Sequence, residues 1–119
     1  MYAKLEPRSG TWEVYEEEAT LETLQLHCEG YVERLMIGRF ILWFNEEGRL
    51  QQLEPSLVTV VSGTFLTLVG PIVVTRFTKD GNFDVAPLTD DDVDLLERIH
   101  EFAHAVVGEF EVPMLIGGN

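Results

Sequence analysis

The most specific chemical pattern in the sequence is a short motif near its C-terminal end. His100, Glu101 and His104 are spaced as in H-E-x-x-H. On a helix, two such histidines lie one turn apart and bind one zinc ion, while the glutamate activates a water molecule. A catalytic site also needs a third ligand, and the carboxylates of Glu109 and Glu111 follow too closely for the usual arrangement. We therefore interpret the histidines first as a half-exposed pair at the rim of the core, with no cofactor. A zinc-dependent hydrolase is kept as an alternative.

Two groups of acidic residues form a second candidate site. Their members are Glu16, Glu17, Glu18, Asp90, Asp91, Asp92 and Asp94. The aspartates begin a predicted helix, where negative charge complements the positive end of the helix dipole, so capping explains most of them. If the two groups share a face, they resemble a row of phosphates and form a surface that binds a basic partner.

Four arginines lie on or near the middle strands of the predicted sheet. They are Arg34, Arg39, Arg49 and Arg76. Our first interpretation is that each arginine balances a nearby acid. If they converge instead, they form a site for an anionic ligand such as a nucleotide. The sequence contains no glycine-rich phosphate loop, nucleophile elbow or CxxC pair that would define a catalytic site.

The elements that position these side chains follow from the spacing of apolar residues. Segments that alternate or are rich in β-branched residues predict strands, and glycine, proline and asparagine mark the turns between them. The predicted strands span residues 2–6, 11–17, 31–37, 40–44, 64–69 and 72–77, and residues 57–61 form either a short strand or a turn. We expect an α+β fold, in which a mostly antiparallel sheet is packed by one short helix and one long C-terminal helix.

Both helices have recognisable start signals. A threonine N-cap begins a short helix over residues 20–29. On its apolar face, Cys28 is predicted to be a small buried residue and not a nucleophile, because no lysine or arginine adjoins it. Thr89 and Asp92 form a capping box, and apolar residues at helical spacing predict a second helix over residues 90–109.

Size and charge restrict the class of protein. The 119 residues fit a single domain spanning 1–119, and the 21 acids and 8 bases give a net charge of −13. So much negative charge repels nucleic acid, so direct nucleic-acid binding is not expected. The first residues do not resemble a secretion signal, and no apolar run is long enough to span a membrane. We expect a cytoplasmic protein without membrane contact.

The C-terminal residues 111–116 are mostly apolar. Such a segment forms either the final edge of a sheet or an arm exchanged with another subunit. We therefore expect this segment to take part in self-association.

Six short pieces of the sequence resemble one family in their order and spacing. They are Leu5-Glu6-Pro7, Thr23-Leu24-Gln25, Gly30-Tyr31-Val32-Glu33, Asn45-Glu46-Glu47-Gly48-Arg49-Leu50, Gly63-Thr64-Phe65-Leu66 and Leu88-Thr89-Asp90. Over residues 3–97 the chain is similar to domain of unknown function 3846, a family of bacteriophages, plasmids and gut-bacterial mobile elements. The resemblance implies a mobile-element setting and implies no catalytic residues. It does not include the H-E-x-x-H motif.

The acidity, the incomplete active site and the resemblance together favour an interaction protein without catalytic activity. We expect it to bind a host protein with a basic surface, such as a defence or nucleic-acid-handling protein, and to block it. One alternative is an oligomer that uses the arginines to sequester a small anionic nucleotide signal. The other alternative is the zinc hydrolase.

Overall fold

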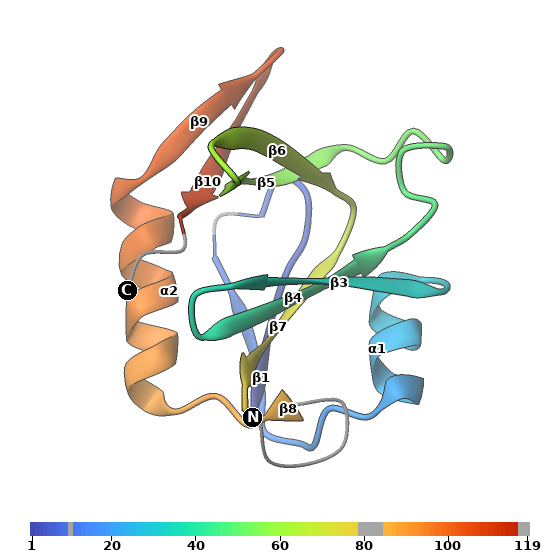
Figure 1. Cartoon of the computed structure of the whole chain (residues 1–119), viewed down its shortest axis with the longest axis vertical. Coiled ribbons are helices and arrows are strands. Elements are labelled where there is room, and N and C mark those ends of the chain that lie inside the picture. The colour runs from blue at the N-terminus through green and yellow to red at the C-terminus, as the bar shows by residue number, and fades with distance from the viewer. Residues whose placement is uncertain (10, 79–84, 117–119) are drawn as a thin grey trace.

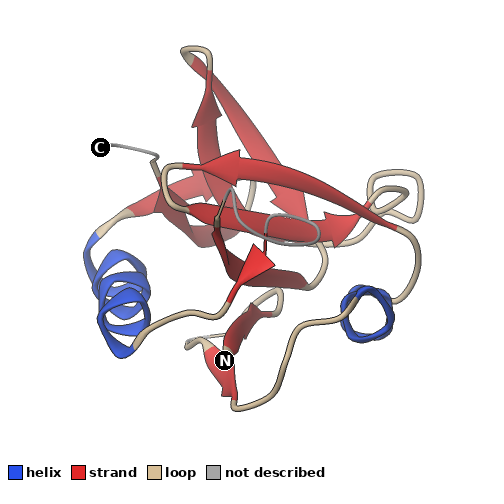
Figure 2. Cartoon of the chain, turned by 60° about the horizontal axis from the view of Figure 1, so that its bottom comes forward, coloured by secondary structure: helices blue, strands red, loops and turns tan. Residues whose placement is uncertain are grey.

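The computed structural model of the chain describes residues 1–9, 11–78 and 85–116. These residues form two sheets and two helices (Figures 1 and 2). In chain order the elements are β1 (Tyr2–Leu5), β2 (Glu13–Tyr15), α1 (Leu21–Cys28), β3 (Val32–Ile37), β4 (Phe40–Asn45), β5 (Pro55–Val61), β6 (Thr64–Val69), β7 (Ile72–Phe77), β8 (Val85–Ala86), α2 (Asp90–Phe102), β9 (His104–Val107) and β10 (Phe110–Leu115). The fold is mostly β with two helices and largely antiparallel sheets, as the α+β prediction broadly required.

The larger sheet has the strand order β2-β1-β7-β4-β3, and the short strand β8 also pairs with β7. Every pairing in this sheet is antiparallel. β4 pairs along one edge of β7, from Ile72 to Arg76. On the other edge, β1 pairs with the first half of β7 and β8 with the end of β7. β1 and β8 therefore lie end to end in one row of the sheet.

Helix α1 covers one face of the larger sheet (Figure 1). Its buried residues Leu24 and Cys28 pack with Ile41, Trp43 and Val73 of the central strands. Because side chains alternate along a strand, the neighbours of these sheet residues point to the opposite face. β4 and β7 are thus buried on both faces, which explains their nearly continuous apolar sequences.

The second sheet and α2 cover the opposite face. This sheet has the order β6-β5-β10-β9. The core there combines residues of both sheets and of α2, namely Leu42, Ile72, Val74, Leu57, Leu68, Leu96 and Leu115.

The predicted extent of the last helix, residues 90–109, is wrong. α2 ends at Phe102, and Ala103 already has extended backbone angles. The next residues form a hairpin in which Val107 pairs with Phe110 across a two-residue turn that contains Gly108 at a φ of 60°. Two adjacent β-branched valines and a glycine suit a hairpin better than a helix, although their apolar spacing fits both.

The C-terminal segment at residues 111–116 is not a free edge. β10 pairs with β9 on one side and, in parallel, with β5 on the other. Its Val112, Pro113 and Leu115 are buried. Self-association through this segment stays a prediction, and it would require β10 to leave a sheet in which both of its edges are paired.

Candidate functional site

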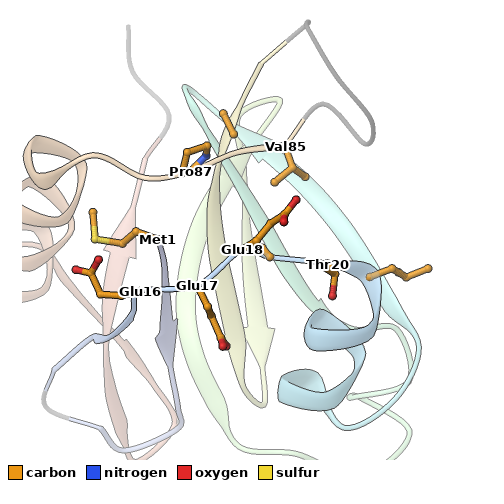
Figure 3. A pocket seen from close by; sticks show the side chains of 10 residues that line it. Met1, Glu16, Glu17, Glu18, Thr20, Val85 and Pro87 are labelled. Carbon is orange, nitrogen blue, oxygen red and sulfur yellow. The ribbon is translucent and has the colours of Figure 1, made fainter.

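A cavity lies at the end of the molecule where β2 leads into α1 (Figure 3). It has a volume of about 630 Å³. The residues that line it are Met1, Glu16, Glu17, Glu18, Ala19, Thr20, Leu21, Val85, Ala86 and Pro87. We call it the acidic pocket, and we call residues 16–18 the acidic segment. This lining offers three carboxylates beside an apolar surface.

The acidic segment is held to the fold through its middle residue. The hydroxyl of Tyr2, which is fully buried, donates a short hydrogen bond to a carboxylate oxygen of Glu17 and lies 2.9 Å from Nε2 of His27. The ring of Tyr15 stacks on that of Tyr2, with centroids 5.1 Å apart. Burial, followed by the contact with Glu17, raises the pKa of Tyr2 well above its usual value, so the hydroxyl keeps its proton. In Figure 3, Glu17 points away from Val85 and Pro87, while Glu18 points toward them.

We expect the free energy of unfolding to fall as the pH drops below about 6.5, the ordinary pKa of histidine. Burial, and then the charge of Lys4, lower the pKa of His27 in the folded chain. The unfolded chain therefore binds this proton more readily. The stability contributed by neutral His27 is fully present above the unfolded pKa and is lost as the pH falls through the lower, folded pKa.

Urea unfolding between about pH 8 and about pH 5 tests this expectation. His27→Gln should make the loss of stability shallower than in the wild type. His104→Gln is the matched control, because the pKa of His104 is raised and its removal should make the loss steeper. Equal slopes for wild type and His27→Gln would contradict the assignment.

Asp92 is separate from the other acidic residues. Its side chain is fully buried, whereas Asp90, Asp91 and Asp94 are exposed. The Asp92 carboxylate accepts a hydrogen bond of 2.9 Å from the Thr89 backbone, and the Thr89 hydroxyl accepts one of 3.2 Å from the Asp92 backbone. The predicted capping box is therefore confirmed. The inclusion of Asp92 in an exposed acidic face is wrong, because the side chain points into the protein.

Two of the four arginines bind this buried carboxylate. Nε of Arg39 and Nη1 of Arg76 each lie 3.0 Å from an oxygen of Asp92. They meet because β4 and β7 pair beside the turn that carries Arg39, with Phe40 opposite Arg76. Burial alone would raise the pKa of Asp92, but the Thr89 hydrogen bonds and the Arg76 guanidinium outweigh it and hold that pKa below its usual value. The carboxylate is thus charged and already paired.

The other two arginines lie elsewhere. The guanidinium of Arg34, on β3, lies 5.9 Å from the ring centroid of Trp43. Arg49, in the β4–β5 connection, donates a hydrogen bond of 2.8 Å to the Thr67 carbonyl. The four arginines therefore do not form one anion site, because Arg39 and Arg76 bind Asp92 whereas Arg34 and Arg49 contact other groups.

The two histidines of the H-E-x-x-H motif do not lie on one helix. His100 is in the last turn of α2, whereas His104 begins β9. One ring nitrogen of His104 lies 2.8 Å from Glu111, and the other contacts the His100 carbonyl. The contact with the carbonyl, and then that with Glu111, raise the pKa of His104. Burial, and then the charge of His104, lower the pKa of His100. Glu101 is exposed, and the described part of the chain contains no cluster of three potential metal ligands. The expected helical geometry is therefore wrong, and zinc binding stays an untested prediction.

Cys28 has the character expected of a core residue. It is fully buried, and burial raises the pKa of its thiol to about 12. Its Sγ donates a weak hydrogen bond of 3.5 Å to the Trp43 carbonyl. The prediction of a small buried residue is confirmed.

A family model described as Domain of unknown function (DUF3846) matches residues 4–103. The chain belongs to this family. No curated protein and no solved structure matches the chain significantly. The DUF3846 match includes every residue of the acidic pocket except Met1, and also includes the Asp92 ion pairs. The whole β9–β10 hairpin lies beyond it.

Sequence reasoning found the carboxylates of the site and missed its apolar side. This apolar side includes Val85, Ala86 and Pro87. Nothing in their spacing indicates that they face the acidic segment, because this proximity depends on where β8 joins the sheet. The Tyr2, Glu17 and His27 contacts were missed for the same reason.

Proposed function

We propose that this chain is a non-catalytic interaction protein of a phage or other mobile element, acting in the host cytoplasm. It binds a basic surface on a host protein, of the kind found in defence or nucleic-acid-handling proteins, and blocks that surface. The mobile-element setting comes from the family resemblance, and the basic partner comes from the charge of the chain.

The observation that carries this proposal is the acidic pocket. Three consecutive glutamates line one cavity together with the segment that leads into α2 (Figure 3). Helix α2 begins at the same end of the molecule (Figure 1), and Asp90 and Asp91 of its first turn are exposed. Negative charge is thus gathered beside an apolar surface on which a partner can exclude water. The net charge of −13 adds long-range attraction for a basic protein.

Described residues outside this end support the proposal less well. Arg39 and Arg76 are already paired with the buried Asp92 carboxylate. This carboxylate stands where an anionic ligand would bind. Both ring nitrogens of His104 already have partners, Glu111 and the His100 carbonyl. The acidic pocket, in contrast, is lined by three glutamates and, among the described residues, by no basic one.

Affinity capture from a host lysate tests the proposal. The immobilised chain should retain a basic protein at about 50 mM salt and release it at about 500 mM, because exposed charges are screened over a few ångströms at high salt. The quadruple variant Glu16→Gln, Glu18→Gln, Asp90→Asn, Asp91→Asn should retain little of that protein. A control with the same change in charge replaces exposed acids elsewhere: Glu33→Gln, Glu46→Gln, Glu47→Gln, Glu109→Gln.

Retention by the control but not by the pocket variant is the expected result. Failure to recover a salt-sensitive basic partner would overturn the proposal. Equal loss in the two variants would also overturn it, because the net charge would then matter and the acidic end would not.

A further inference from the structure

The row of the larger sheet that contains β1 and β8 is incompletely covered on its outer side. β2 pairs with β1 only as far as Tyr15, which is opposite Tyr2. The chain then continues as the acidic segment past the end of β1, where the Leu88 backbone donates a hydrogen bond of 2.9 Å to the Met1 carbonyl. β8 pairs with β7 on one edge, and no hydrogen bond between described residues joins its other edge to the acidic segment. The acidic pocket occupies this gap (Figure 3).

Three exposed glutamates stand beside the gap, and the chain bends at the middle one. Glu17 is held by its hydrogen bond with Tyr2. Glu16 and Glu18 flank this bend and line the cavity. Met1, Leu21 and Val85 add apolar surface to the same cavity. Among the described residues, the gap therefore combines a strand edge without a backbone partner, the carboxylates of Glu16 and Glu18, and an apolar lining.

We infer that the acidic pocket accepts an extended basic segment of the partner, which adds a strand at the free edge of β8 and places lysine or arginine side chains against Glu16 and Glu18. This inference rests on the proposed function and specifies how the partner is recognised. An added strand gains backbone hydrogen bonds from a sheet edge, and alternate side chains provide specificity. Residues two apart on such a strand point the same way, so basic residues at alternate positions present their charges on one side of it. Their aliphatic stems pack on the apolar lining while their charged ends stay at its rim.

A defined peptide tests the inference without a known partner. The probe is a fluorescent, acetylated octapeptide of alternating lysine and valine, titrated with the full chain at low salt and followed by anisotropy. Two comparison peptides separate the contributions. In one, alternate amides are N-methylated, which preserves charge and removes backbone donors. In the other, glutamate replaces lysine.

The wild-type chain should bind the probe, and Glu16→Gln with Glu18→Gln should weaken binding by about tenfold, the loss of two partly screened ion pairs. The matched control, Glu46→Gln with Glu47→Gln, changes the same charge at exposed positions outside the pocket and should bind like the wild type. N-methylation should weaken binding by about tenfold as well, since the paired edge is then lost. The glutamate peptide should not bind.

Three results would overturn the inference. They are no binding of the probe, equal effects of the pocket and control variants, and unchanged binding of the N-methylated peptide. The last result would remove strand addition while leaving a charge-based partner intact. Failure of the proposed function itself is recognised separately, by the absence of a salt-sensitive partner in the capture experiment.

Discussion

Asp92→Ala is expected to lower the free energy of unfolding by about 3 kcal/mol. The Asp92 side chain has no exposed surface, and its carboxylate binds two arginines, Arg39 and Arg76. Its removal leaves two guanidinium groups without the opposite charge, and also removes one of the two hydrogen bonds of the α2 capping box, while the N-cap Thr89 stays in place. Breaking a fully buried pair costs about 3–5 kcal/mol and losing a capping hydrogen bond about 1 kcal/mol. The arginine side chains are 44% and 37% exposed, so water replaces part of the lost interaction.

Asp91→Ala is the matched control for this variant. Asp91 occupies the same first turn and has the same charge, but its side chain is exposed. It contributes mainly through the helix dipole, so its loss should cost less than about 1 kcal/mol. Urea unfolding of the two variants at neutral pH measures the difference. Equal destabilisation by the two substitutions would contradict the assignment of Asp92 as a buried charge that fastens α2 to the sheet.

Capping, turn and spacing rules predicted the structure correctly where it depends on residues of one segment. The threonine caps at Thr20 and Thr89, and the strands on either side of the tight turn at Gly38, needed only neighbouring residues to be recognised. The buried character of Cys28 likewise followed from its helical spacing. In these segments capping, turn residues and apolar period favour the same structure.

Local rules failed where two structures fit one pattern. Val106, Val107 and Phe110 continue the apolar spacing of α2, yet they form a hairpin. The decision depends on β5, which offers an edge with which β10 pairs. The helical spacing of the apolar residues therefore extended the predicted helix into a segment that forms strands, one of which pairs with β5.

The charged residues of the candidate site were predicted, but the side chains that they contact were not. The run of three aspartates gives no sign that one of them is buried while its neighbours are exposed. That difference arises because helical geometry turns Asp92 toward the sheet, where Arg39 and Arg76 meet. In the same way, the acidic segment faces Val85 and Ala86 only because β8 occupies the row of β1.

Photo-cross-linking in host lysate tests most directly whether the acidic pocket is the surface that meets a partner. A photoreactive phenylalanine derivative replaces Leu21, which lines the pocket and is 41% exposed. The control places it at Leu50, which is 85% exposed in the β4–β5 connection and does not line the pocket. We expect a discrete adduct with a basic protein from position 21, strong at low salt and weak at high salt, and no such adduct from position 50. Adducts of equal yield from both positions, or an adduct from position 50 alone, would contradict the account.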